Sequence, residues 1–165
     1  MTKVWISGIS GMIGFHLALK LKYLGFDVSG VDNFNDYYDV HLKYERNRIL
    51  MNKGILVKRA DIAEFNTYEE WFSNKPDVVI HLAAYCAPRH SLEFPQLYID
   101  TNITGTQKLI NACELYDVND VVYASSSCVM HGQPLPWNET DRPGHQNNPY
   151  GWSKRVNECQ FGHSK

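Results

Sequence analysis

The sequence lacks any long apolar run. No stretch approaches the roughly 18 consecutive apolar residues that a membrane-spanning helix needs, so we expect no membrane segment. Residues 1–7 carry no charged stretch followed by a long apolar one, and we therefore expect no secretory signal. The sequence also has no excess of positive charge, because it contains 16 lysines and arginines and 18 acidic residues. This balance argues against a nucleic-acid partner.

Cysteine is scarce, and its spacing excludes the usual cysteine chemistry. The four cysteines stand at positions 86, 113, 128 and 159. No two of them form a C-x-x-C pair, and no His/Cys spacing matches a zinc site. The seven histidines include no pair at i, i+4 helical spacing beside an acidic residue. We expect free thiols in a reducing cytoplasm, no disulfide framework and no bound metal.

The remaining composition is that of a folded globular protein. Of the 165 residues, 44% are hydrophobic and 21% are charged, which suits a soluble chain with a full core. This length is typical of one domain, so we interpret residues 1–165 as a single domain.

Short runs of high β-propensity alternate with helical patterns. The five β-prone runs are residues 3–7, 27–31, 55–59, 78–82 and 120–125. Apolar residues recur at helical spacing over 13–24 and 99–113, and more weakly over 41–52 and 67–73. A last helix is expected from Pro149, with Asn148 as its N-cap. Five β–α units predict an α/β fold, a doubly wound parallel sheet (Rossmann fold) of five strands in the order 3-2-1-4-5 with helices on both faces.

A glycine-rich loop joins the first expected strand to the first expected helix. Gly8, Gly11 and Gly14 form a G-x-x-G-x-x-G pattern. Glycine is needed where the backbone turns with positive φ, and where a Cβ would strike a pyrophosphate or block packing of helix on strand. The helix that follows, from Met12 and Ile13, would present N–H groups and a partial positive charge to phosphates. The pattern predicts a dinucleotide site.

Asp32 ends the second expected strand, at the spacing from the glycines that this fingerprint requires. Its carboxylate can accept hydrogen bonds from both adenosine ribose hydroxyls, whereas a 2′-phosphate there would meet like charge. Asn33 follows, with no arginine beside it, which favours NAD over NADP. The aromatic and basic residues of segment 37–48 are interpreted as a loop near the adenosine and a solvated helix.

A serine run and a Y-x-x-x-K pair suggest redox chemistry. Residues 125–127 are three serines at the end of the last expected strand, where ligands bind in parallel sheets. Tyr150 and Lys154 share one face of the last helix. The lysine ammonium would favour the phenolate, so the tyrosine can serve as general base on a hydroxyl or general acid on a carbonyl. A serine hydroxyl would fix the reacting oxygen.

Together these residues resemble the extended short-chain dehydrogenase/reductase family, the nucleotide-sugar epimerases and dehydratases. The resemblance covers nearly all 165 residues. Segments 32–39 and 89–95 look most like UDP-glucuronate 4-epimerases. The other matching segments are the glycine loop, Val31–Asn33, Asp61–Ile62, His81–Ala84, Asn102–Gly105, Ser125–Ser127 and the pair Tyr150 and Lys154.

The resemblance implies a role for each matching position. The glycines would hold the pyrophosphate, Asp32 the ribose, Asp61 and Ile62 the adenine border, and Lys154 the nicotinamide ribose as well. The implied catalytic residues are Ser127, Tyr150 and Lys154, with Ser126 as second choice for the serine. The implied cofactor-binding residues are Gly8, Gly11, Met12, Ile13, Gly14, Asp32, Asn33, Asp61, Ile62, Ala83, Ala84, Asn102, Tyr150 and Lys154.

The expected activity is NAD-dependent hydride transfer with a secondary alcohol or ketone on a sugar or nucleotide-sugar. Family members are about twice as long, and their later part grips the nucleotide-sugar. The resemblance therefore implies weak or no epimerase activity in the isolated chain. Two alternatives stay open: a non-catalytic dinucleotide-binding module or subunit of a larger assembly, and a fragment completed by a separate chain.

The expected partners are a small-molecule substrate and a second copy of the chain. One face of the last helix carries Tyr150, and the opposite face carries Trp152. The face that carries Trp152 needs another surface to pack against, so we expect a homodimer through helices 99–115 and 149–162.

Overall fold

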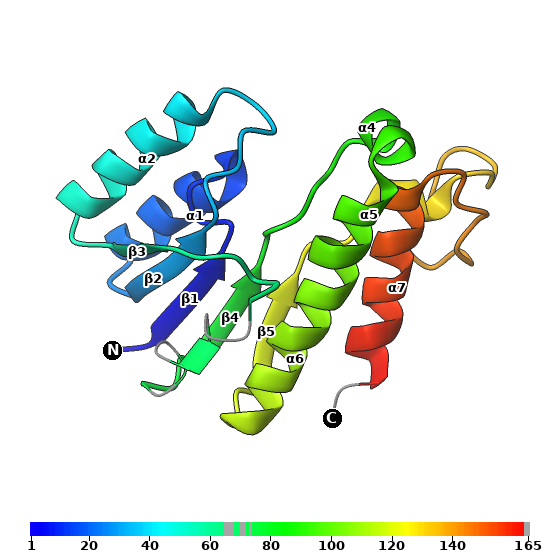
Figure 1. Ribbon diagram of the computed structural model, residues 1–165. Coiled ribbons are helices and arrows are strands. Elements are labelled where there is room, and N and C mark those ends of the chain that lie inside the picture. Colours follow the sequence, from blue (N-terminus) through cyan, green and yellow to red (C-terminus); the bar gives the residue numbers. More distant parts are fainter. Residues whose placement is uncertain (65–67, 70–71, 73, 164–165) are drawn as a thin grey trace. The chain divides into compact units, whose positions relative to one another are not determined.

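The computed structural model describes residues 1–64, 68–69, 72 and 74–163 (Figure 1). The weak helix expected over residues 67–73 falls largely outside these described residues. The chain divides into two compact units, which are taken in turn below. The first comprises residues 1–83 and 111–123, and the second comprises residues 84–110 and 124–165.

The first unit is built on a five-stranded parallel sheet. Its strand order is β3-β2-β1-β4-β5, and every neighbouring pair is parallel (Figure 1). This confirms the predicted fold class and strand order. The strand bounds differ from the expected runs by at most two residues. The strands are β1 (Lys3–Ser7), β2 (Asp27–Asp32), β3 (Leu56–Arg59), β4 (Val78–His81) and β5 (Asp120–Tyr123).

Two helices of the first unit connect β1 to β2 and β2 to β3. Helix α1 (Met12–Tyr23) leads from β1 to β2, and Gly25 follows its end with φ of 88°. Glycine adopts this left-handed conformation without strain, and the helix stops there. Helix α2 (Val40–Asn52) leads from β2 to β3, and the Asp39 side chain accepts a hydrogen bond from the His41 N–H at its start.

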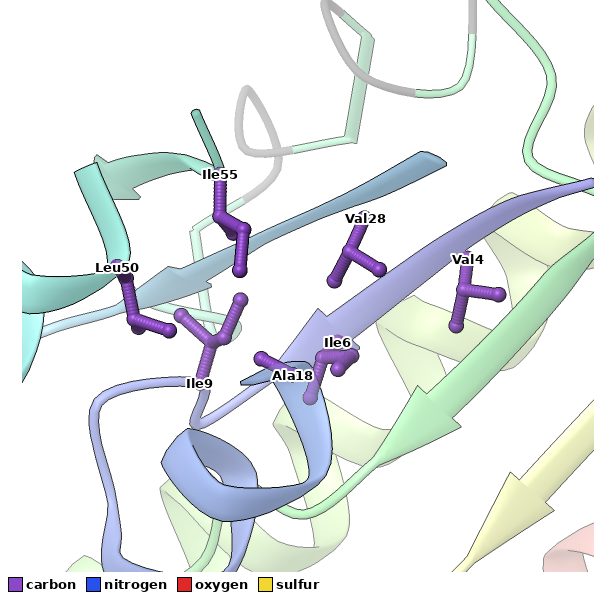
Figure 2. Packing of buried hydrophobic residues seen from close by; sticks show 7 residues of the cluster. All are labelled: Val4, Ile6, Ile9, Ala18, Val28, Leu50 and Ile55. Atoms are coloured by element: carbon purple, nitrogen blue, oxygen red, sulfur yellow. The ribbon is translucent and has the colours of Figure 1, made fainter. Parts of the chain in front are cut away.

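The core of this unit lies between the sheet and these helices. β1 contributes alternate residues to its two faces, as a pleated strand must. Trp5 faces the aromatic rings of Tyr68 and Phe72, 6.1 and 5.3 Å away between centroids. On the opposite face of β1 lies an aliphatic cluster, shown in Figure 2. Its buried members are Val4, Ile6, Ile9, Ala18, Val28, Leu50 and Ile55.

The second unit is mainly helical. The single helix expected over residues 99–113 begins instead with a π-helical segment and continues as α6. The reason is side-chain bonding to its carbonyls, described below. The elements are α4 (Pro88–Glu93), α5 (Pro95–Tyr98), the π-helix η1 (Ile99–Gly105), the first half of α6 (Thr106–Leu115), the 3-10 helix η2 (Ser127–Met130) and α7 (Pro149–His163).

Helix α7 begins where the sequence indicated. The Asn148 side chain accepts a hydrogen bond from the Gly151 N–H at 2.8 Å, which is the N-cap geometry, and Pro149 occupies the first helical position. Within the described ranges, no helix has the length and apolarity needed to cross a bilayer.

Removal of the Leu50 side chain tests the aliphatic cluster. Leu50 is fully buried, so Leu50→Ala leaves a cavity and should lower the free energy of unfolding by about 2–5 kcal/mol. Leu42→Ala on the same helix is the control, because Leu42 is 50% exposed and should change stability by less than ~0.5 kcal/mol. Urea denaturation measures both. Equal effects of the two substitutions would show that the cluster is wrongly placed.

Candidate active site

The glycine loop joins β1 to α1 in a tight backbone turn. Gly8 has φ of 73°, and a Cβ on it would lie 2.9 Å from the backbone nitrogen of Ala83. A Cβ on Gly14 would overlap the carbonyl oxygen of Gly8. The Gly11 N–H donates to that same carbonyl at 3.0 Å. The three glycines therefore serve the turn and the close packing that the pattern predicted.

The start of α1 has the features of an anion site. No side chain caps its first turn, and no acidic residue lies there. Met12 and Ile13, the first two residues, are 64% and 62% exposed. The first N–H groups of a helix lack partners within the helix, so they are available to a phosphate. The Ser10 hydroxyl beside them is buried and has no hydrogen-bond partner, which fits a cradle shaped for a further polar group.

Asp32 lies at the carboxyl end of β2 and is 5% exposed. Its Oδ2 accepts from the Ser10 N–H at 3.2 Å, which ties the acid to the glycine loop. Its Oδ1 accepts from the Phe34 N–H at 2.9 Å and from Lys43 Nζ at 3.1 Å. The carboxylate is thus fixed in direction at the position expected for a ribose acceptor, and it is paired with a buried lysine of α2.

Two further candidate cofactor-binding residues, Asn33 and Asp61, are joined by a hydrogen bond. Asn33 Nδ2 donates to Asp61 Oδ2 at 3.0 Å, and Asp61 Oδ1 accepts from the Ala63 N–H. Ile62 is buried. The structure therefore brings Asn33 and Asp61 together, as their common assignment to the adenosine end requires.

The end of β4 is held to the end of β1 by side chains. Ser7 Oγ lies 2.7 Å from His81 Nδ1 and accepts from the N–H groups of Leu82 and Ala83, each at 3.1 Å. His81 is buried. This histidine aligns two strands at the edge where ligands bind in parallel sheets. No three His, Cys, Asp or Glu side chains of the described residues gather where they could hold a metal ion.

In the second unit, the three serines differ in what their hydroxyls do. Ser125 Oγ donates to Glu158 at 2.6 Å, and Ser126 Oγ caps η2 by accepting from the Cys128 N–H at 3.2 Å. Ser127 is exposed, and its hydroxyl makes no hydrogen bond within the part of the chain that the structure describes. The Ser126 hydroxyl still has its own proton to donate, so the choice of Ser127 over Ser126 stays a prediction.

Tyr150 and Lys154 lie on the buried face of α7. They are 8% and 4% exposed. The Tyr150 ring packs edge-on against Tyr98, with centroids 6.2 Å apart, and Lys154 Nζ donates to the Ala124 carbonyl at 2.9 Å. Burial lowers the pKa of the Lys154 ammonium from 10.5 to about 8, and the nearby Cys86 thiol opposes this shift. The lysine is therefore held in place, and its pKa lies nearer to neutral than that of an exposed lysine.

The π-helix η1 is fastened to α7 by amide side chains. Asn102, 1% exposed, accepts from the Tyr85 N–H at 2.9 Å and donates to the Tyr85 carbonyl and to Ser153 Oγ, each at 3.0 Å. Asn157 donates to the Asn102 carbonyl at 2.7 Å, and Gln160 donates to the Ile103 carbonyl at 3.2 Å. Wide π turns often occur at functional sites. Here both N–H groups of the Asn102 amide bond protein atoms, so the residue positions α7, and its contact with a cofactor stays a prediction.

Sequence reasoning missed Lys43 and the amide pair of α7. Segment 37–48 was interpreted as a loop and a solvated helix, yet Lys43 is only 6% exposed. The available signal was its spacing, because Lys43 and the buried Leu50 lie two helical turns apart on one face of α2. A lysine at a core-facing position needs an acid, and Asp32 provides it.

Comparison with known proteins settles the family. The model of the NAD-dependent epimerase/dehydratase family matches residues 4–161 of this chain. The chain belongs to this family. Among curated relatives, the UDP-glucuronate 4-epimerase of Thermodesulfobacterium geofontis is 37% identical over 155 residues, which cover 93% of this chain and 48% of the relative. The chain spans about half the length of the curated relatives it matches.

Solved structures agree with this family. The UDP-glucose 4-epimerase of Bifidobacterium longum, in complex with NAD+ and UDP, has a TM-score of 0.85 at 30% identity over 96% of this chain and 47% of that one. A mutant UDP-glucuronic acid 4-epimerase of Bacillus cereus has a TM-score of 0.87 at 29% identity over 98% of this chain and 51% of that one. It is in complex with UDP-4-deoxy-4-fluoro-glucuronic acid and NAD. NAD is the cofactor of the epimerase/dehydratase family, and the uncapped start of α1 and the Asp32 carboxylate in the first unit fit its adenosine half.

The lowered pKa of Lys154 makes the free energy of unfolding depend on pH. Between pH about 8 and 10.5 the folded chain has released this proton whereas the unfolded chain still holds it. The free energy of unfolding of the wild type should therefore rise over this window relative to Lys154→Met. Urea denaturation at several pH values measures the difference. A lysine NMR resonance that is lost in Lys154→Met should titrate near 8, and a midpoint near 10.5 would contradict the assignment.

Proposed function

We propose that this epimerase/dehydratase-family chain binds NAD and transfers a hydride between a secondary alcohol of a nucleotide-sugar and that cofactor. The observation that carries the proposal is the buried pair of Tyr150 and Lys154 on α7. Burial of an ammonium costs free energy that hydrogen bonds must offset, and for Lys154 the structure gives a bond to the neutral Ala124 carbonyl. Acid–base chemistry at the phenol is the purpose that fits the family.

The first unit supports the adenosine half of the cofactor. The glycine loop and the uncapped start of α1 would bind the pyrophosphate through backbone N–H groups. Asp32 would accept hydrogen bonds from the ribose hydroxyls with its remaining lone pairs, and Asn33 and Asp61 would border the adenine. Ser10 offers a buried hydroxyl without a partner to the same corner.

The second unit supports the chemical step. NAD, when bound, supplies the hydride acceptor. Ser127 would hold the substrate hydroxyl through its available Oγ. Tyr150, as phenolate, would take the proton from that hydroxyl, and it would return the proton to a carbonyl in the reverse direction. The Lys154 ammonium would favour the phenolate by charge, while its bond to the Ala124 carbonyl keeps it directed.

The substrate class comes from the relatives. Curated relatives and solved neighbours are named as epimerases of UDP-glucuronate and UDP-glucose. We therefore extend the proposal to a UDP-sugar, with UDP-glucuronate as first choice. Epimerisation adds a second step, in which the ketone turns over and takes the hydride back on its other face. The expectation of weak or absent epimerase activity in the 165-residue chain stays a prediction.

The setting of the enzyme is also part of the proposal. A cytoplasmic location and a homodimer through helices 99–115 and 149–162 stay predictions. The dimer is supported by the outer face of α7, where Trp152 and Val156 are half-buried and Cys159 is exposed.

Cofactor choice tests the adenosine half. We expect NAD to bind more tightly than NADP, because Asp32 occupies the position of a 2′-phosphate. Asp32→Ala should raise the dissociation constant of NAD by roughly tenfold, or about 1.4 kcal/mol. The dissociation constants of NAD and NADP should then lie closer together. Isothermal titration calorimetry gives all four dissociation constants. Tighter binding of NADP than of NAD by the wild type would refute the assignment.

Tyr150→Phe tests the chemical step. The change removes only the group that transfers the proton, so turnover should fall by about 10²–10⁴-fold while the affinity for NAD stays nearly unchanged. The assay follows formation of reduced nicotinamide with UDP-glucuronate, UDP-glucose and simple secondary alcohols. Tyr44→Phe, on an exposed ring of α2, is the matched control. Full turnover in Tyr150→Phe would eliminate this tyrosine as the acid–base group, whereas wild-type binding of NAD without any turnover would favour the non-catalytic module.

A further inference from the structure

Tyr98 is a buried tyrosine of the second unit that has no part in the chemistry proposed above. It ends α5, and α5 and η1 pack along α7, the helix that carries Tyr150 and Lys154 (Figure 1). The residue is completely buried. A buried hydroxyl without a hydrogen-bond partner costs free energy, so the partners of this hydroxyl show what Tyr98 holds in place.

The Tyr98 hydroxyl bonds both backbone groups of one residue, Ala87. It donates to the Ala87 carbonyl at 2.9 Å and accepts from the Ala87 N–H at 3.3 Å. With its proton on that carbonyl, the oxygen also accepts from His90 Nδ1 at 3.2 Å. A phenol has one proton and two lone pairs, so these three bonds use its whole capacity. The hydroxyl therefore fixes the backbone at Ala87.

Asn102, one helical turn after Tyr98, bonds a second residue in the same way. Its amide accepts from the Tyr85 N–H and donates to the Tyr85 carbonyl. Segment 85–87 belongs to no helix or strand, so these side chains supply bonds that a regular element would otherwise provide. Cys86 lies between the two residues, and the backbone is held on both sides of it.

Both contacts of Tyr98 lead to the pair on α7. Its ring packs edge-on against the Tyr150 ring, with centroids 6.2 Å apart. Its hydroxyl fixes Ala87, and the adjoining Cys86 thiol lies near enough to the Lys154 ammonium to interact with its charge. The backbone that carries Cys86 is thus part of the surroundings that bury Lys154. Accurate placement matters here, because a misplacement of about 1 Å can cost a factor of about 10² in rate.

We propose that Tyr98 is a positioning residue for the acid–base pair, with its ring set against Tyr150 and its hydroxyl holding the backbone beside Lys154. The inference rests on the proposed function, because the placement of the pair affects the rate only if Tyr150 transfers the proton. Tyr98 is fully buried and in this role contacts neither substrate nor cofactor. It acts on the rate of the chemical step and on the surroundings of Lys154, and the affinity for NAD does not depend on it.

Tyr98→Phe separates the hydroxyl from the ring. The change keeps the ring against Tyr150 and removes both bonds to Ala87, so the backbone beside Lys154 loosens and water reaches the ammonium. Turnover should fall by about tenfold, while the dissociation constant of NAD stays within about twofold of the wild-type value.

NMR titration of Lys154 gives a readout that does not depend on activity. In Tyr98→Phe, the midpoint of the lysine resonance that Lys154→Met removes should move up from about 8 toward 10.5. The direction follows because burial, the larger of the two influences on this pKa, becomes weaker. A folded Tyr98→Phe variant that keeps either the wild-type turnover or the wild-type midpoint contradicts the proposal.

Tyr68→Phe is the matched control. Tyr68 is also buried, its hydroxyl donates to the Ile62 carbonyl at 2.8 Å, and it lies in the first unit. Loss of either hydroxyl should lower the midpoint of urea denaturation, yet Tyr68→Phe should leave the turnover at saturating NAD and the Lys154 midpoint unchanged. An equal loss of turnover in the two variants would show a general effect of stability and would overturn the proposal.

His90→Phe is the second variant should Tyr98→Phe fail to fold. It keeps an aromatic ring stacked on Tyr85 and removes the bond from Nδ1 to the Tyr98 hydroxyl. Turnover and the Lys154 midpoint should move in the same directions by smaller amounts, and wild-type values of both contradict the proposal. A wild type that binds NAD without any turnover would contradict the proposed function instead, and the Lys154 midpoint of the variants would then decide the positioning role.

Discussion

The close approach of backbone segments at the carboxyl end of β1 is the constraint on which the first unit depends. The turn at Gly8 needs a positive φ, and the helix that follows passes so near that Gly14 has no room for a Cβ. Gly30 on β2 has none either, because a Cβ there would overlap the Ile6 carbonyl. Gly8 and Gly14 fix where α1 begins relative to β1, and Gly30 lets β2 approach β1. They thereby place uncapped N–H groups at the edge of the sheet beside Asp32.

Much of this could be predicted from the sequence. The glycine loop, the five β-prone runs and the Asn148–Pro149 helix start are local signals, and local backbone preferences determine the elements they mark. The alternation of strands and helices and the handedness of crossovers leave only a few strand orders, and the doubly wound order 3-2-1-4-5 is the one we chose among them. The choice of Ser127 over its two neighbours came from an ungapped match to the family. In the structure Ser125 Oγ donates to Glu158 and Ser126 Oγ accepts from the Cys128 N–H, and the choice among the serines stays a prediction.

What the sequence could not show depends on contacts between distant residues. Nothing in a helical pattern predicts a π segment, because its cause lies elsewhere, in the amides of Asn157 and Gln160 that bond its carbonyls. The ion pair of Lys43 with Asp32 is hidden for the same reason, since it joins a helix face to a strand end 11 residues away. Burial of Lys154, which lowers its pKa to about 8, also arises only from the packed state.

The account as a whole claims that one dinucleotide binds with its pyrophosphate on the glycine loop and its adenosine ribose at Asp32. A crystal structure of this chain with NAD tests this claim most directly. The account predicts pyrophosphate density against the N–H groups of residues 11–13 and ribose hydroxyls within hydrogen-bond distance of the Asp32 carboxylate. Density for the dinucleotide at any other place, with the glycine loop bare, would contradict it.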